Sequence, residues 1–413
     1  MSTELNGGIV KRAAHLADGR ELFYFDDADT TLGPERAVDV RVLGPRPETA
    51  TMRQDVLTGD WISIAANRQN RVFLPPPDRD PLAPQSSDNP SEIPAVYDVA
   101  VFENRSPSFG PALGRGAAHP LPNQGDSAPE PGANRDFGSA STESPSFGQG
   151  AEYIAARDAP RGLDDLDEFG LGRTRSSVGR CEVVCFSPDT SGSFGTQTES
   201  RARTVVEAWA DRTAALSALP GVEQVFPFEN RGEAIGVTLH HPHGQIYAYP
   251  YITPRTTRVL DSIDRTTPQL FQLILDSERE GPRVLLSGEH WTAYVPFAAR
   301  WPVEVHLLPH RQVPDFAATT SAERDELAGL YLRLLRGIDA MYDSPTPYIA
   351  AWHQAPVHRG RETVRLHLEL TSPRRAADRL KYLAGSEAAM GAWIGDVAPE
   401  DAAADIRKAI ESI

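Results

Sequence analysis

The sequence predicts an α+β protein, in which a few helices pack on a long and mainly antiparallel sheet. Short runs of strand-forming residues, bounded by Gly, Pro, Asn or Asp, recur along most of the chain. Two longer segments, 198–219 and 320–341, instead repeat apolar residues at helical spacing. Around the first of these segments the expected order is strand, helix, strand, loop and strand, and we expect the rest of the fold to extend this core.

The chain has 413 residues, a formal net charge of -16 and a pI of about 5.2. This length permits one large or two medium globular units with a substantial core. The acidic balance argues against general nucleic-acid binding, which depends on basic surface. No segment has the length and apolarity of a membrane span, and the first residues lack the apolar core of a signal peptide. We therefore expect a cytoplasmic protein with neither nucleic-acid nor membrane partners.

Before residue 106 we expect strands at 22–25, 38–42, 57–64 (a turn leading into a strand) and 99–105. Residues 106–180 differ, because they are rich in Gly, Pro, Ser, Ala and Asp and hold few aliphatic residues. Such a stretch buries too little apolar surface to offset the entropy lost on ordering, so we expect a disordered insert between two strands.

Beyond the insert, strands are expected at 181–186, 222–228, 284–286, 291–297, 303–310 and 366–370. The helix at 198–219 ends before Pro220 and Gly221, and a capping box from Thr320 to Glu323 opens the helix at 320–341. An amphipathic helix closes the chain at 400–413. Cys181 and Cys185 would share one strand face, too far apart for an unstrained disulfide, so we expect two buried thiols in a reducing compartment.

The run 238–250 carries the strongest chemical signal, because its alternation places His241, His243 and Gln245 on one face of a strand. A neutral imidazole can attack phosphorus, provided that an acceptor holds its other ring nitrogen as N–H. A carboxamide beside it can donate to phosphoryl oxygens. Pro242 indicates an edge or an irregular strand end. The alternative is a surface strand that carries histidines without chemistry.

These residues lie within a larger pattern. His-Pro-His-Gly-Gln at 241–245, preceded by Phe-Glu-Asn-Arg-Gly at 228–232, resembles the active-site signature of the galactose-1-phosphate uridylyltransferase family, part of the histidine-triad superfamily. Leu-Thr-Gly-Asp-Trp at 57–61, Trp-His-Gln-Ala-Pro at 352–356 and Leu-His-Leu-Glu at 366–369 also match, so the resemblance covers most of the chain outside the insert.

The resemblance implies two histidine-triad-like halves in one intertwined catalytic unit. We place the first at 1–230, with the insert at 106–180, and the second at 231–413. Phe-Glu-Asn-Arg occurs at both 102–105 and 228–231, which is consistent with duplication. The strand at 303–310, with Glu304, His306 and His310 on one face, resembles a decayed copy of the active-site strand, and we interpret it as a polar sheet face rather than a metal site.

The implied activity is uridylyl transfer from UDP-glucose to galactose 1-phosphate, a step of galactose metabolism, by double displacement through a uridylyl-histidine. His243 would be the nucleophile, Gln245 would steady the phosphoryl oxygens, and the His241 carbonyl or another acceptor would hold the second nitrogen. Two other functions stay open: a related enzyme using another acceptor (another sugar phosphate, or a phosphorylase or hydrolase), and a non-catalytic sugar-nucleotide-binding paralogue.

Further site residues follow from the resemblance. Two arginines, Arg68 and Arg71, would hold phosphate oxygens. The remaining expected substrate-binding residues are Asn104, Asn230, Gly236, Thr238, Lys381 and Glu387. In the family the lysine and glutamate reach the sugar nucleotide partly across a dimer interface, so a homodimer is implied.

Metal sites are less well matched. Zinc-bearing relatives carry a Cys-x-x-Cys pair where this chain has Asp80 and Ala83, and a histidine near Thr190, which leaves His241 as the clear survivor. Because a structural zinc site needs four ligands, we predict that this site is lost. Near the C-terminus His353, His367 and Glu369 could bind zinc or iron, the alternative being buried hydrogen-bonded residues.

Overall fold

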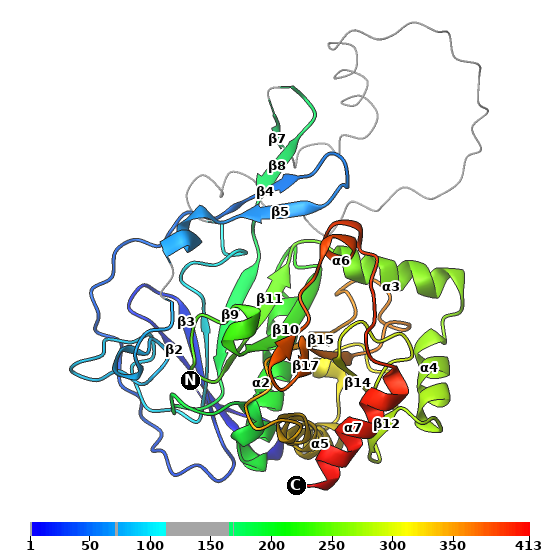
Figure 1. Ribbon diagram of the computed structural model, residues 1–413. Coiled ribbons are helices and arrows are strands. Elements are labelled where there is room, and N and C mark those ends of the chain that lie inside the picture. The colour runs from blue at the N-terminus through cyan, green and yellow to red at the C-terminus, as the bar shows by residue number, and fades with distance from the viewer. Residues whose placement is uncertain (1, 71–72, 113–164, 168) are drawn as a thin grey trace, which may run out of the picture.

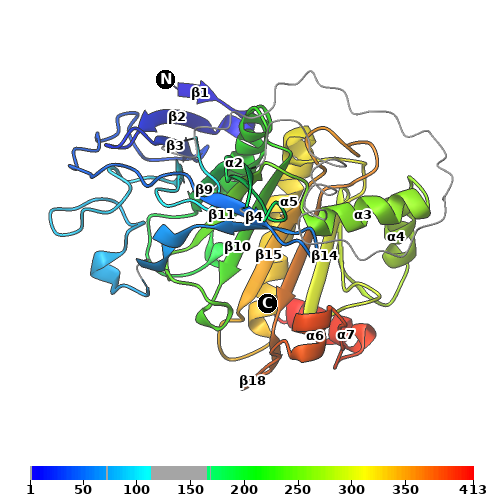
Figure 2. The same cartoon turned by 90° about the horizontal axis from the view of Figure 1, so that it is seen from above.

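The computed structural model describes residues 2–70, 73–112, 165–167 and 169–413. Its centre is a twelve-stranded sheet in the order β1-β2-β3-β6-β9-β11-β10-β15-β16-β14-β13-β12, and all of its neighbouring strands are antiparallel (Figures 1 and 2). The α+β class predicted from the sequence is therefore confirmed.

The strands of this sheet are β1 (Ser2–Glu4), β2 (Val10–His15), β3 (Glu21–Asp26), β6 (Val99–Glu103), β9 (Arg180–Cys185), β10 (Gln224–Arg231), β11 (His243–Tyr249), β12 (Val284–Ser287), β13 (Trp291–Tyr294), β14 (Val303–Pro309), β15 (Tyr348–His353) and β16 (His367–Ser372). A small sheet holds β4 (Thr51–Gln54), β5 (Trp61–Ile64), β7 (Asp165–Leu166) and β8 (Arg173–Ser176), and β17 (Arg374–Ala376) pairs with β18 (Arg379–Leu380). The α-helices are α2 (Glu199–Ser217), α3 (Pro254–Arg265), α4 (Leu270–Arg279), α5 (Ser321–Ala340), α6 (Gly385–Met390) and α7 (Pro399–Glu411).

The two halves of the sheet repeat one connectivity. In the first half the spatial order is β6-β9-β11-β10, with α2 between β9 and β10 in the chain. The second half mirrors it as β15-β16-β14-β13, with α5 between β14 and β15. The halves join where β10 pairs with β15, Phe228 opposite Ala351.

This symmetry corrects the prediction that 303–310, which forms β14, copies the active-site strand. The counterpart of β11 is β16, which follows β15 as β11 follows β10 and lies at the matching place in the sheet. His367 and Glu369 on β16 therefore stand where His243 and Gln245 stand on β11.

The main core lies on one face of the sheet, against α2, α5 and α7 (Figure 2). Trp209 of α2 and Tyr331 of α5 pack around Trp352 of β15, and Ile410 of α7 is buried in the same cluster. The predicted capping box is confirmed, since Thr320 accepts from the Glu323 amide and Glu323 from the Thr320 amide. Two helices on the opposite face, α3 and α4, were not predicted. The sequence does contain indications of them: Pro254 in the first turn of α3, and an apolar stripe that includes Leu260, Ile263 and Leu275.

Two local expectations were wrong. Residues 38–42 form no strand, and Val38, Val40 and Val42 are exposed because no neighbouring strand pairs with them. The expected insert is not wholly irregular, since β8 pairs with β4, Thr51 opposite Ser176. Residues 113–164 and 168 of that stretch lie outside the described residues.

Two sequence expectations about sulfur and membranes can be compared with the fold. Cys181 and Cys185 are buried and not joined by a disulfide, as predicted. Within the described residues, none of the helices combines the length and apolarity that crossing a lipid bilayer requires.

The α5–α7 contact yields a stability prediction. A Cβ added at Gly337 would run into Ile410, including its main-chain Cα, so Gly337→Ala should lower the free energy of unfolding by about 1–2 kcal/mol despite the better helix propensity of alanine. The matched control is Gly329→Ala in the same helix, whose Cβ would meet only the end of the Glu199 side chain. Urea unfolding of both variants checks the expectation, and equal stabilities would contradict it.

Candidate active site

Two adjoining cavities open at the start of β11. The larger has a volume of about 520 Å³ and the smaller about 150 Å³, and His243, Gln245 and Thr238 line both. The larger cavity is further lined by Arg20, Asn67, Pro81, Leu82, Glu92, Phe102, Asn104, Arg105, Ser106, Val183 and Leu239. The smaller cavity is further lined by Arg68, Phe228, Asn230, Gly236, Val237 and Tyr247. His243 thus lies where the two spaces meet.

The local sequence explains why the strand begins at His243. Pro242 has no amide hydrogen to donate to a ladder, and pairing starts with His243 opposite Cys185. A side chain at Gly244 would lie 2.9 Å from the Phe186 ring and 3.0 Å from the Phe228 carbonyl oxygen, so glycine is required for the close approach. His243 and Gln245 share the cavity face as predicted, whereas His241 precedes the strand and its ring is buried behind the cavity.

One hydrogen bond fixes the tautomer of His243. Its Nδ1 lies 2.7 Å from the main-chain carbonyl oxygen of His241, which can only accept. Nδ1 therefore carries the proton, and in the neutral imidazole Nε2 carries the lone pair. A neutral imidazole in this tautomer is prepared to act as a nucleophile through Nε2.

Arginine side chains line both cavities beside this histidine. In the described part of the chain, Nη1 of Arg68 is buried without a hydrogen-bond partner, and Arg68 lines the same cavity as His243 and Gln245. Arg105 and Arg20 line the larger cavity, and Arg20 is paired with Asp18 and Glu92. An unsatisfied guanidinium nitrogen beside a nucleophile suits an anionic ligand such as a phosphate.

The cavities assemble most of the site residues predicted from the sequence: His243, Gln245, Arg68, Asn104, Asn230, Gly236 and Thr238. Arg71 lies outside the described residues. Lys381 and Glu387 do not line these cavities but pair with each other, Nζ to Oε1 at 3.1 Å, and Lys381 also donates to the Arg300 carbonyl oxygen.

Several cavity residues were not predicted. Asn67 adjoins Arg68 in the same polar loop, and Arg105 ends the first Phe-Glu-Asn-Arg run, so both had a weak local signal. The larger cavity is also lined by Arg20, Glu92 and Val183. These residues come from distant parts of the chain, so no local sequence pattern predicts that they meet there.

Glu229 lies beside the site on β10 and is fully enclosed. Burial raises the pKa of its carboxyl to about 8, against the opposing effects of Arg231 and of a hydrogen bond from the Tyr348 hydroxyl at 3.1 Å. Glu229 is therefore mainly protonated at neutral pH, and its Oε2 makes no hydrogen bond within the described structure.

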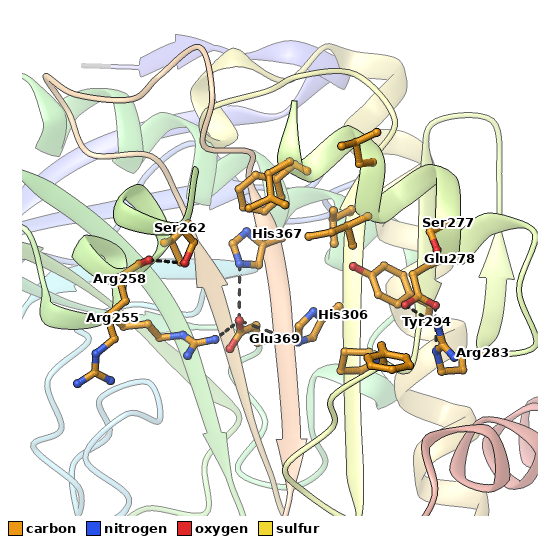
Figure 3. Close-up of a pocket in the computed structure, with 18 residues that line it drawn as sticks. Arg255, Arg258, Ser262, Ser277, Glu278, Arg283, Tyr294, His306, His367 and Glu369 are labelled. Carbon is orange, nitrogen blue, oxygen red and sulfur yellow. Dashed lines mark hydrogen bonds and ion pairs between the residues drawn. The ribbon is translucent and has the colours of Figure 1, made fainter. Parts of the chain in front are cut away.

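The predicted C-terminal cluster is assembled around Glu369, at the polar end of a cavity of about 600 Å³ between the α3–α4 pair and the sheet (Figure 3). Nε2 of His353 lies 3.5 Å, and Nε2 of His367 3.7 Å, from the Glu369 carboxylate. His306 joins them at 3.9 Å from β14, although the sequence assigned it only to a polar face. Burial lowers the pKa of His353 to about 4, so this imidazole is neutral at pH 7.

The residues of this cluster do not fit a metal ion as they stand. Arg255 contacts Oε1 of Glu369 directly, and Arg300 lies 3.5 Å from Oε2, so the carboxylate already has its counter-charge. Among the described residues, no group of three or more His, Cys, Asp or Glu side chains could hold a metal ion. The site predicted at His353, His367 and Glu369 is thus a charge-balanced polar cluster.

The place of the relatives' zinc site also has its polar groups paired. Nδ1 of His241 lies 2.7 Å from Oδ2 of Asp80, and its Nε2 lies 2.8 Å from the Ser187 carbonyl oxygen. These direct contacts leave no room between the groups for an ion, so Asp80 and His241 do not fit zinc. The predicted loss of that site stays a prediction.

Comparison with known proteins agrees with the geometry. The family models named galactose-1-phosphate uridyl transferase, N-terminal and C-terminal domain, match residues 140–253 and 264–412. A galactose-1-phosphate uridylyltransferase of Streptomyces lividans is 40% identical, over 97% of this chain and 98% of its own length. One of Thermotoga maritima is 29% identical, over 86% of this chain and 98% of its own. A solved uridylyltransferase structure superposes with a TM-score of 0.67 at 24% identity, covering 88% of this chain and 99% of that one, and supports the fold.

Glu229 generates a pH-dependent prediction. Its pKa in the folded protein lies above the ordinary value near 4.5, so its contribution to stability is complete below pH 4.5 and is lost as the pH rises towards 8. Glu229→Gln keeps an acceptor for Tyr348 and cannot ionise. From pH 5.5 to 8 the stability of this variant should rise by about 3 kcal/mol relative to the original protein, measured by urea unfolding. Exposed Glu280→Gln is the control, and parallel pH curves for Glu229→Gln and the original would contradict the expectation.

The charge-balanced cluster predicts that chelators leave the unfolding temperature unchanged, whereas losing a structural metal would lower it by several degrees. Arg255→Ala should expose the Glu369 carboxylate and make the unfolding temperature rise with added zinc. Arg258→Ala, one turn along the same helix at an exposed position, should show no such rise. A stoichiometric metal in the purified original protein, measured by mass spectrometry, would refute the assignment.

Proposed function

Because the chain belongs to the galactose-1-phosphate uridylyltransferase family and is a nucleotidyltransferase, we propose that it transfers a uridylyl group from UDP-glucose to galactose 1-phosphate by double displacement through His243. The observation that carries this proposal is the hydrogen bond from His243 Nδ1 to the His241 carbonyl oxygen, which leaves Nε2 as the nucleophilic atom in a cavity shared with Gln245.

In the first displacement, Nε2 of His243 attacks the α-phosphorus of UDP-glucose. A nitrogen–phosphorus bond forms, and the bond from the α-phosphorus to the bridging oxygen breaks, so that glucose 1-phosphate leaves with that electron pair. Nδ1 keeps its proton throughout, and the His241 carbonyl stabilises the positive charge that the ring acquires.

In the second displacement, a phosphate oxygen of galactose 1-phosphate attacks the same phosphorus. The nitrogen–phosphorus bond breaks, UDP-galactose forms, and His243 regains its lone pair. Gln245 donates to the phosphoryl oxygens in both steps, and Arg68 neutralises the charge that gathers there. Asn104 lines the larger cavity and Asn230 the smaller one, and both supply amide groups for the nucleotide.

A homodimer belongs to this proposal. Lys381 and Glu387 lie away from the cavities of their own chain. Large apolar side chains are exposed nearby: Tyr382, between these two residues, is 76% exposed, and Met390, just beyond them, is 80% exposed. Such side chains suit contact with a second copy rather than with water. The proposed setting is the cytoplasm, as expected from the sequence.

The test is the intact mass of the protein after incubation with UDP-glucose alone. We expect a uridylyl adduct on the original protein, none on His243→Ala, and a retained adduct on His240→Ala, which alters an exposed neighbouring histidine. Galactose 1-phosphate should then release the adduct as UDP-galactose.

Other outcomes separate the remaining functions. An adduct that galactose 1-phosphate does not discharge would assign a different acceptor and overturn the substrate. UDP-glucose binding without any adduct, measured by calorimetry, would overturn the double displacement and favour a non-catalytic sugar-nucleotide-binding paralogue.

A further inference from the structure

We propose that Asp80 is a positioning residue for His243, acting through a buried hydrogen bond with His241. The proposal rests on the proposed function, in which His243 is the nucleophile. It assigns to Asp80 and His241 together the task of holding the carbonyl group that selects the reactive tautomer.

The contacts of His241 fix the position of its ring. Its side chain is fully buried, and both ring nitrogens have partners. Nδ1 lies 2.7 Å from Oδ2 of Asp80, and because an ionised carboxylate only accepts, Nδ1 donates to Asp80. Nε2 lies 2.8 Å from the Ser187 carbonyl oxygen and 3.0 Å from the Tyr97 hydroxyl. The ring is therefore held from both sides.

The surroundings of Asp80 support an ionised carboxylate. Oδ1 accepts from the Leu82 amide at 2.9 Å while Oδ2 accepts from His241. Burial alone would raise the pKa of Asp80, but the hydrogen bond and charge of His241 outweigh it and lower the pKa below the usual value. A carboxylate that receives two donors remains charged at neutral pH.

The Tyr97 hydroxyl connects the segments that surround His241. It lies 2.8 Å from the Leu82 carbonyl oxygen, 2.9 Å from that of Ser187 and 3.0 Å from His241 Nε2. The hydroxyl has one proton to donate among these three atoms. The loop of Asp80, the segment of Tyr97, the end of β9 and the start of β11 are thereby tied at one point.

The contacts of Asp80, His241 and Tyr97 hold the main chain on which His243 depends. The carbonyl of His241 receives the His243 Nδ1 proton, and the next carbonyl, that of Pro242, accepts from the Phe186 amide at 3.1 Å. His241 is thus anchored through its side chain and the following peptide through the neighbouring strand. A shift of the carbonyl by even about 1 Å would misalign the nucleophile, an error that commonly costs about 100-fold in rate.

The second half of the fold provides an independent parallel. There His367 corresponds to His243, and its Nδ1 donates to the carbonyl oxygen two residues earlier, that of Arg365, at 2.8 Å. The buried guanidinium of Arg365 donates to the carbonyl oxygens of Pro309 and His310, at the end of β14. Because β14 corresponds to β9, Arg365 holds the end of β14 as His241 holds Ser187 beyond the end of β9. In both halves a buried side chain two residues before the strand histidine fixes the acceptor of that histidine.

Asp80 can be changed without altering the cavities themselves. It accepts from His241 Nδ1 but is not among the residues that line either cavity. Its removal should therefore act on His243 without touching the substrate.

The experiment compares Asp80→Ala, Asp80→Asn and the control Asp78→Ala, which removes an exposed carboxylate from the same loop. The rate of uridylyl-histidine formation from UDP-glucose is measured by quenched mass spectrometry, beside the KM and urea unfolding. We expect Asp80→Ala to lower the maximal rate about 10- to 100-fold with little change in KM. Asp80→Asn, whose amide can still bond to His241 Nδ1, should recover part of that loss, and Asp78→Ala should match the original protein.

A second measurement needs no substrate. Nitrogen NMR of the histidine rings should show Nδ1 of His241 protonated and hydrogen-bonded in the original protein, and this hydrogen bond lost in Asp80→Ala. An unprotonated Nδ1 of His241 in the original, a full rate in folded Asp80→Ala, or a rise in KM alone would overturn the proposal. Absence of any adduct on the original protein would instead overturn the proposed function, while the NMR result would still decide whether the hydrogen bond from His241 to Asp80 exists.

Discussion

The hydrogen bond from His243 Nδ1 to the His241 carbonyl oxygen is the constraint on which the proposed chemistry depends. It converts an ordinary imidazole into one whose lone pair is on the nitrogen that the cavity needs. Much of the local sequence serves this bond: Pro242 delays the start of the strand, Gly244 allows the strand to lie against Phe186, and pairing with β9 fixes the direction in which His243 and Gln245 point.

The same bond exists in the second half, yet its surroundings differ in charge. On β11 the histidine is followed by Gln245, a neutral group that can donate to phosphate, and on β16 it is followed by Glu369, which repels phosphate and binds arginine. One backbone arrangement therefore supports the proposed phosphate site in the first half and a closed polar cluster in the second. The difference lies in side-chain charge and in the two helices, α3 and α4, that cover the second half (Figure 3).

The sequence was sufficient where the signal is local. Alternation around His243 predicted the strand β11, and apolar spacing predicted α2 and α5. The motif resemblance predicted seven of the residues that line the two cavities. The sequence was insufficient where the partners of a segment are distant in the chain. Val38, Val40 and Val42 alternate as in a strand but have no strand to pair with. Arg20 lines the cavity although it is far in sequence from His243. The sequence also could not anticipate that Arg255 would reach Glu369, because an ion pair across 114 residues leaves no trace in either segment.

The strand pairing between β10 and β15 affects how the two halves of the sheet unfold. Because Phe228 to Arg231 pair with Tyr348 to Ala351, the two halves share a set of main-chain hydrogen bonds, in addition to the side-chain contacts between α2 and α5. Separating them would expose two unprotected strand edges, each able to recruit another chain. The halves are therefore committed to unfolding together, and a fragment that ends between them would be an aggregation template rather than a smaller enzyme.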